Sequence, residues 1–212
     1  MLIDIFHDTV CPWCRIGKKH LFDALAQWQS ETVQIDWHPF LLDDTVPNSG
    51  YEFRSFMQTR KSIGVEELQY MFDYARLVGE AAGVKLDFNK IRLAVNTKLS
   101  HRLIALAPKN VKNHIVEAIY QAYFEDGLNI GDIDVLVTIG TAYQMGAMEL
   151  RSQLNNDVAI QAIVAESTLV RSHGITSVPF FIINNKVKVN GSHSVEGFLQ
   201  ALNTAALQDI KR

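Results

Sequence analysis

The chain has 212 residues, of which 48% are hydrophobic and 20% are charged, a composition that excludes a disordered or fibrous protein and suits a soluble globule with a sizeable core. Its 20 lysines and arginines against 23 acids give a net charge of −3, so the chain lacks the basic field that gathers nucleic-acid phosphates. No apolar run approaches the roughly 20 residues that cross a bilayer, so we expect neither a nucleic acid nor a membrane as a partner.

The N-terminal part of the chain predicts a strand, a helix and a second strand. Residues 2–7 are mostly apolar and alternate like a strand inside a sheet, and they lack the positive segment and apolar core of a secretory signal. Apolar and small side chains then recur at every third or fourth position after Cys11-Pro12, which indicates a helix that runs to about Gln29. Residues 33–40 alternate again until Pro39 ends regular pairing. This order of elements is a βαβ unit. Because residues 2–7 lack the pattern of a secretory signal, we expect the protein to be cytoplasmic.

The middle of the chain, residues 51–173, changes to segments with a period of 3.6 residues and shows no convincing strand signal. We therefore expect this span to be entirely helical. The predicted helices, several of them bounded by glycine, proline or an aspartate N-cap, cover residues 53–63, 65–82, 91–107, 110–126, 132–145, 147–155 and 157–173.

Strand signals return near the C-terminus. Residues 179–183 and 186–190 predict two strands joined by Asn184-Asn185, a pair that tolerates the positive φ of a tight hairpin. A last helix is predicted over residues 194–206. Because no repeat or flexible linker separates these parts, we interpret residues 1–50 and 174–212 as one discontinuous α/β domain and residues 51–173 as a helical insertion domain.

The sequence contains two cysteines, Cys11 and Cys14, in a Cys-Pro-Trp-Cys motif that follows the first strand and opens the first helix. Two cysteines so spaced in a reducing compartment are typical of redox or metal chemistry rather than of a structural disulfide. Unpaired N–H groups and the positive end of the helix dipole favour a thiolate at Cys11, which we expect to be the exposed nucleophile. Cys14, one turn further along the apolar stripe, is the expected resolving thiol.

Neighbouring residues support a redox interpretation of the motif. Pro12 fixes φ in the first helical turn without removing a needed hydrogen bond. Arg15, Lys18 and Lys19 follow in the next turns, and we expect their positive charges to favour the Cys11 thiolate further. A zinc site is the competing interpretation, but structural zinc needs four ligands and the sequence has no second CxxC or HxxxH motif. We therefore predict no bound metal.

A second element, Thr176-Ser177-Val178-Pro179, places a proline at the start of a strand. Together with the order of strands and helices, it makes the chain resemble the thioredoxin fold, in which a cis-proline faces the CxxC motif, and the helical insertion resembles the DsbA branch of that superfamily. The resemblance implies a cis Val178-Pro179 bond, and it implies that Pro12, Trp13, Val178 and Pro179 contact the substrate.

Shorter motifs narrow the resemblance to the FrnE-like group of DsbA-family thiol–disulfide oxidoreductases. They extend along nearly the whole chain: Cys11-Pro12-Trp13-Cys14 with Ile16-Gly17-Lys18, Trp37-His38-Pro39-Phe40, Asn96-Thr97 with His101-Arg102-Leu103, Ala122-Tyr123-Phe124, Ser177-Val178-Pro179-Phe180-Phe181 and Gly191-Ser192-His193. The resemblance implies that His101 lines the cleft above Cys11. The residues alone leave open an ordinary, solvated His-Arg pair on a helix surface.

The resemblance leaves two enzyme functions to distinguish. The first is a thiol–disulfide oxidoreductase that acts on thiol- or disulfide-containing proteins or small molecules and needs no bound cofactor. The second is a glutathione-dependent isomerase or transferase of the 2-hydroxychromene-2-carboxylate isomerase or kappa-class type. Those proteins lack the paired cysteines and use bound glutathione, whereas this sequence keeps both thiols. Glutathione is therefore expected only as a candidate co-substrate, a redox-sensing protein is a third hypothesis, and the oligomeric state is left open.

Overall fold

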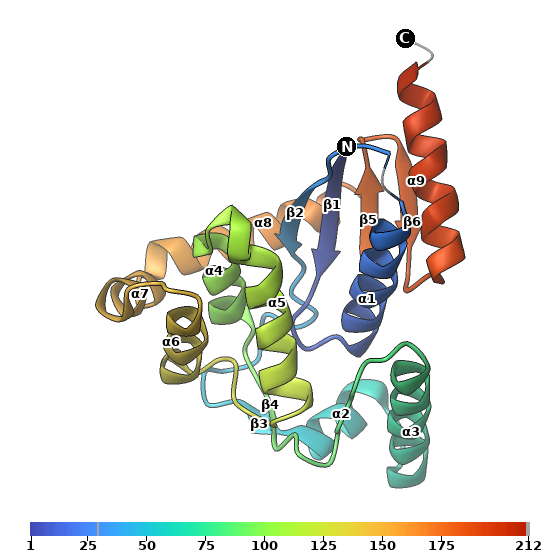
Figure 1. The fold of residues 1–212 in the computed structure, drawn as a ribbon. Coiled ribbons are helices and arrows are strands. Elements are labelled where there is room, and N and C mark those ends of the chain that lie inside the picture. The colour runs from blue at the N-terminus through green and yellow to red at the C-terminus, as the bar shows by residue number, and fades with distance from the viewer. Residues whose placement is uncertain (29, 211–212) are drawn as a thin grey trace.

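A computed structural model describes residues 1–28 and 30–210, and its centre is a mixed four-stranded sheet in the order β2-β1-β5-β6 (Figure 1). Strand β1 (Leu2–His7) pairs in parallel with β2 (Gln34–Pro39) and antiparallel with β5 (Phe180–Ile183). Strand β6 (Val187–Asn190) forms the edge beyond β5. Segments from the two ends of the chain thus share one sheet, in agreement with the sequence prediction.

One face of the sheet is covered by α1 (Pro12–Gln27) and α9 (Val195–Ile210), which lie side by side in Figure 1. Ile3 and Ile5 of β1 pack there with Leu21, Phe181 and Phe198, and each of the five side chains is at most 1% exposed. This burial of the apolar stripe of α1 fixes the helix that carries the Cys-Pro-Trp-Cys motif. The predicted end of this helix at Gln29 lies outside the described residues.

The hairpin between β5 and β6 turns at Asn184 and Asn185, which have φ values of 50° and 56°. Asparagine adopts this left-handed conformation at a smaller cost than most residues, as the sequence prediction assumed.

Between β2 and β5 the described chain is mainly helical, with seven helices in sequence. They are α2 (Phe53–Lys61), α3 (Val65–Ala81), α4 (Lys98–Leu106), α5 (Lys109–Phe124), α6 (Ile133–Ala142), α7 (Ala147–Leu154) and α8 (Asp157–Ser172). The apolar faces of α2 to α7 form a second, larger core that also contains Cys11 and Cys14. Within the described ranges, none of the helices is both long and apolar enough to span a membrane.

The expectation of a purely helical middle segment is wrong at two short strands. Strand β3 (Tyr51–Glu52) pairs antiparallel with β4 (Leu93–Ala94), and α4 begins only at Lys98, seven residues after the predicted helix start at Ile91. Asn96 explains the late start. Its buried side-chain amide donates to the carbonyl of Val46, and its side-chain oxygen accepts from the N–H of Lys98, a local turn that competes with helix formation.

Helix α8 is attached to the sheet by a histidine that bridges two carboxylates. The ring of His38 on β2 contacts Asp4 on β1 at 2.8 Å through Nε2 and Glu166 on α8 at 3.0 Å through Nδ1. Burial alone would lower the pKa of His38, but the hydrogen bonds to Asp4 and Glu166 raise it to about 9. His38 therefore holds a positive charge between the two acids at neutral pH.

Candidate active site

The Cys-Pro-Trp-Cys motif forms the start of α1. Cys11 is the N-cap residue with extended backbone angles (φ −91°, ψ 113°), and Pro12 occupies the first helical turn as predicted. The carbonyl of Cys11 accepts a hydrogen bond from the N–H of Cys14 at 3.1 Å. Both cysteines are free thiols in this structure. Cys11 thus lies at the N-terminus of α1, the positive end of the helix dipole.

Burial of Cys11 differs from the sequence expectation. The residue is only 4% exposed, so the prediction of an exposed nucleophile is wrong for this structure. The cause is tertiary, because Cys11 belongs to the core of the helical segment, against which the partly buried side chains of Trp13 and Val178 pack. Trp13 also contacts the ring of Tyr74 on α3, with ring centroids 5.9 Å apart. The Cys11 side chain is therefore almost entirely out of contact with solvent.

Cys14 lies one turn further into the molecule. It is 2% exposed, and burial followed by a hydrogen bond with Cys11 raises its pKa well above the ordinary thiol value. A nearby Asp8 carboxylate raises it further, while a backbone hydrogen bond from Asp8 opposes the shift. Cys14 therefore remains a protonated thiol at neutral pH, which is the state expected of a resolving thiol before a mixed disulfide forms.

The segment preceding β5 faces the motif. The Val178-Pro179 peptide bond is cis, as expected, and the carbonyl of Val178 lies 3.9 Å from the sulfur of Cys11. Pro179 is buried against α1. A Cβ atom on Gly17 would lie 3.0 Å from the Pro179 ring, so the close approach of this loop requires a glycine at that position of the helix.

His101 is buried rather than exposed on a helix surface. It is 3% exposed, and its Nε2 atom lies 3.4 Å from an oxygen of Asp8, which is itself 1% exposed. The other oxygen of Asp8 accepts a hydrogen bond from the N–H of Leu42 at 2.7 Å. His101 thus belongs to a buried polar group next to the cysteines. The neighbouring Arg102 instead contacts Gln153 on α7.

Sequence reasoning assigned no redox role to three buried polar residues behind the motif, His7, Asp8 and Tyr120, and considered His7 only as a candidate zinc ligand. Nδ1 of His7 is hydrogen-bonded to the hydroxyl of Tyr120 at 2.8 Å, a contact between residues 113 positions apart. Burial lowers the pKa of His7, and burial together with the charges of Cys14 and Cys11 raises that of Tyr120. Among the described residues, Nε2 of His7 has no hydrogen-bond partner. A polar His-Asp-Thr run at the end of an apolar strand was the available signal.

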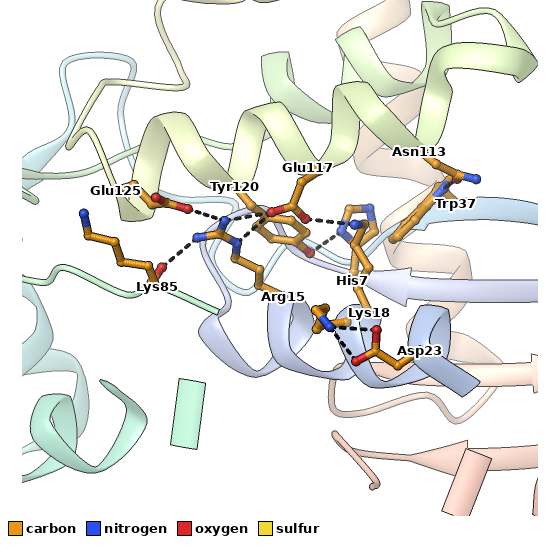
Figure 2. Close-up of polar contacts among 11 residues, drawn as sticks. His7, Arg15, Lys18, Asp23, Trp37, Lys85, Asn113, Glu117, Tyr120 and Glu125 are labelled. Carbon is orange, nitrogen blue, oxygen red and sulfur yellow. Dashed lines mark hydrogen bonds and ion pairs between the residues drawn. The ribbon is translucent and has the colours of Figure 1, made fainter. Parts of the chain in front are cut away.

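The cations of α1 are paired with acids, as Figure 2 shows for Arg15. Arg15 contacts Glu117 at 2.7 Å and Glu125 at 2.5 Å and donates to the carbonyl of Lys85. Lys18 contacts the same Glu117 at 2.8 Å, and Lys19 contacts Asp23. The expectation that Arg15, Lys18 and Lys19 add net positive potential at Cys11 is therefore wrong, since carboxylates offset these charges.

A metal site finds no support in the described part of the chain. No group of three or more histidine, cysteine and acidic side chains lies close enough together there to hold an ion. His38, which contacts two carboxylates, does so through opposite sides of its ring, a geometry that does not converge on one ion.

The mixed sheet, the CxxC motif at the start of the first helix and the proline loop opposite it define the thioredoxin-like class, with the helical segment typical of DsbA-like proteins. Residues 2–203 match the family described as the DSBA-like thioredoxin domain, and the chain belongs to this family.

Solved structures show the same fold. The chain is similar to a probable DsbA oxidoreductase of Streptomyces coelicolor, with 26% identity, 97% of this chain and 90% of that chain covered, and a TM-score of 0.87. It also resembles a 2-hydroxychromene-2-carboxylate isomerase (10% identity, 100% and 98% covered, TM-score 0.73). A third similar structure is the cytosolic disulfide reductase DsbM of Pseudomonas aeruginosa with glutathione (14% identity, 100% and 98% covered, TM-score 0.63). The last two likenesses concern the fold alone.

Proposed function

We propose that this protein is a thiol–disulfide oxidoreductase of the FrnE-like group that exchanges its Cys11-Cys14 disulfide with substrate thiols. The observation that carries the proposal is the difference between the two thiols. Cys11 stands at a helix N-terminus beside the Val178 carbonyl, and Cys14 is a buried thiol whose pKa is raised. One thiol is thus placed to attack and the other to wait, which is the arrangement that disulfide exchange requires.

The exchange balances without a cofactor. In the reducing direction the Cys11 thiolate attacks one sulfur of a substrate disulfide and expels the other as a thiolate, which forms a mixed disulfide. Cys14 then loses its proton and attacks the Cys11 sulfur, so that two electrons pass to the substrate and Cys11-Cys14 becomes oxidised. The buried Asp8–His101 pair is the proton acceptor that we assign to Cys14, because the Asp8 charge acts on this thiol. The oxidising direction reverses these steps.

Substrate contacts follow from the same geometry. In this proposal Pro12, Trp13, Val178 and Pro179 border the sulfur of Cys11 and bind the chain that carries the target cysteine. His101 contributes through Asp8 rather than by direct contact. The fold shared with a cytosolic disulfide reductase supports a cytoplasmic location in this proposal, which cell fractionation would test.

Two single substitutions test the exchange mechanism. Cys14→Ser leaves a nucleophile without a resolving thiol, so we expect mixed disulfides with substrate proteins on non-reducing gels and the loss of multiple-turnover insulin reduction. Cys11→Ser serves as the matched control and should abolish both trapping and turnover. Full turnover by Cys14→Ser would exclude the proposal.

A glutathione-dependent isomerase or transferase is the second candidate. The shared fold with a 2-hydroxychromene-2-carboxylate isomerase and with a glutathione-bound reductase favours it, whereas the retention of both thiols does not. In that case glutathione would be a co-substrate, and the chemistry would not need Cys14. Tight glutathione binding together with unchanged turnover in Cys14→Ser would establish this function instead.

A further inference from the structure

Two cations on the first turns of α1 share one carboxylate on α5. Glu117 accepts from Nε and Nη2 of Arg15 at 3.2 and 2.7 Å through one oxygen and from Lys18 at 2.8 Å through the other. The side chains of Arg15 and Lys18 are only 4% and 10% exposed, so solvent screens them little. With Glu125 as the second partner of Arg15, two positive and two negative charges meet in this cluster and cancel.

This charge cluster lies close to the thiols. Arg15 directly follows Cys14, and Glu117 is one helical turn before Tyr120 on α5 (Figure 2). After burial, the charges of Cys14, Cys11, Asp8 and Glu117 all raise the pKa of Tyr120, so the two thiols and Glu117 all lie near this one hydroxyl group. Burial alone would raise the pKa of Glu117, but the cations of Lys18 and Arg15 lower it, so Glu117 is an anion at neutral pH.

We propose that Glu117 is a positioning residue that makes the Cys11-Cys14 disulfide a weaker oxidant, by cancelling the positive charge that Lys18 and Arg15 would otherwise place beside the Cys11 thiolate. The inference deepens the proposed disulfide exchange and rests on it. Reduction of the disulfide by two electrons leaves a thiolate at Cys11 and a thiol at Cys14. A net positive charge nearby stabilises that reduced state, and Glu117 removes this stabilisation.

The remaining ionisable groups around the thiols do not cancel the positive charge of Lys18 and Arg15 in place of Glu117. Burial lowers the pKa of His7, which stays neutral, and Asp8 and His101 contact each other. Lys19 contacts Asp23 at a more exposed position, with its side chain 41% exposed. Lys18 and Arg15 are therefore the buried cations of α1 whose positive charge is offset by Glu117.

The test is the isosteric substitution Glu117→Gln, which keeps one acceptor oxygen, replaces the other by a donor NH2 group and leaves the cluster with one excess positive charge. We expect an increase of about fivefold in the thiolate-to-thiol ratio of Cys11, because one excess charge on buried side chains acts through an effective dielectric well below that of water. Thiolate ultraviolet absorbance as a function of pH measures this ratio. The equilibrium constant with glutathione should shift by a similar factor, which makes the disulfide more oxidising by about 20 mV.

Control variants separate charge from structure. Lys18→Met should lower the thiolate ratio, because it leaves one excess negative charge, and the double variant Glu117→Gln/Lys18→Met should return it close to the wild-type value. Asp23→Asn releases the exposed Lys19 and should change the ratio less than about twofold. Circular dichroism reports whether each variant folds, and Lys18→Met alone decides the sign if Glu117→Gln does not fold.

Two outcomes would overturn the proposal: an unchanged thiolate ratio in Glu117→Gln, or shifts in the same direction for Glu117→Gln and Lys18→Met, as general loosening would produce. Failure of the proposed function is a separate result. It would appear as a wild-type protein that exchanges no disulfide, while the thiolate titration, which needs no substrate, would still measure the charge effect.

Discussion

Substitution of Gly17, in the helix that carries the cysteines, by alanine has two opposing effects on the free energy of unfolding. Alanine is the better helix former by about 1 kcal/mol. Its Cβ, however, would lie 3.0 Å from the Pro179 ring, 3.3 Å from Phe181 and 3.3 Å from the backbone of Ser192. Phe181 is fully buried and Pro179 is held in the loop before β5, so neither can move aside freely. Overpacking of this kind costs about 1 to 3 kcal/mol. We therefore expect Gly17→Ala to lower the free energy of unfolding by up to about 2 kcal/mol.

Gly197 provides the matched control for this prediction. It lies in the first turns of α9, and an added Cβ would meet only ordinary contacts, the nearest 3.4 Å away at His193. Gly197→Ala should therefore stabilise the protein by about 0.5 to 1 kcal/mol. Urea denaturation of both variants gives the comparison, and insulin reduction should slow only in Gly17→Ala, because the Val178 carbonyl moves relative to Cys11. Equal stabilisation by the two substitutions would refute the packing argument.

Three further predictions concern ionisable and buried polar groups. The folded-state pKa of His38 is about 9, above its ordinary value of 6.5, so its stabilising effect is complete below pH 6.5 and is lost as the pH rises through 9. The stability difference between wild type and His38→Gln should shrink by about 1 to 2 kcal/mol over that range after allowance for solvent screening, and a constant difference would contradict the assignment. Burial raises the pKa of the Cys14 thiol, so iodoacetamide at neutral pH should modify Cys11 first, as peptide mass spectrometry can show; prior modification of Cys14 would reverse the roles. Tyr120→Phe removes the hydrogen bond to buried His7 and should cost about 1 to 3 kcal/mol in urea denaturation, whereas a neutral effect would mean that His7 finds another partner.

Local sequence patterns predicted the parts of the molecule that short-range physics controls. The Cys-Pro-Trp-Cys motif after an apolar strand placed Cys11 at a helix N-terminus, and Asn184-Asn185 predicted the hairpin. Helix periodicity located most of the insertion. It failed at residues 91–97, where Asn96 satisfies backbone groups through a local turn and a contact with Val46, because short apolar runs do not distinguish a helix from an extended segment.

Only the tertiary structure decided which charges and polar groups meet around the cysteines. Arg15 and Glu117 are 102 positions apart, and His7 and Tyr120 are 113 positions apart. A local pattern identifies a cation on α1 but not the acid that cancels its charge, because that acid is brought in by the packing of α5. The burial of Cys11 has the same origin, since most of the core that contains it, and the Val178 side chain packed against that core, come from segments distant in the sequence. The sequence by itself therefore determined which residues can carry the chemistry, and long-range packing determined the electrostatic environment in which they work.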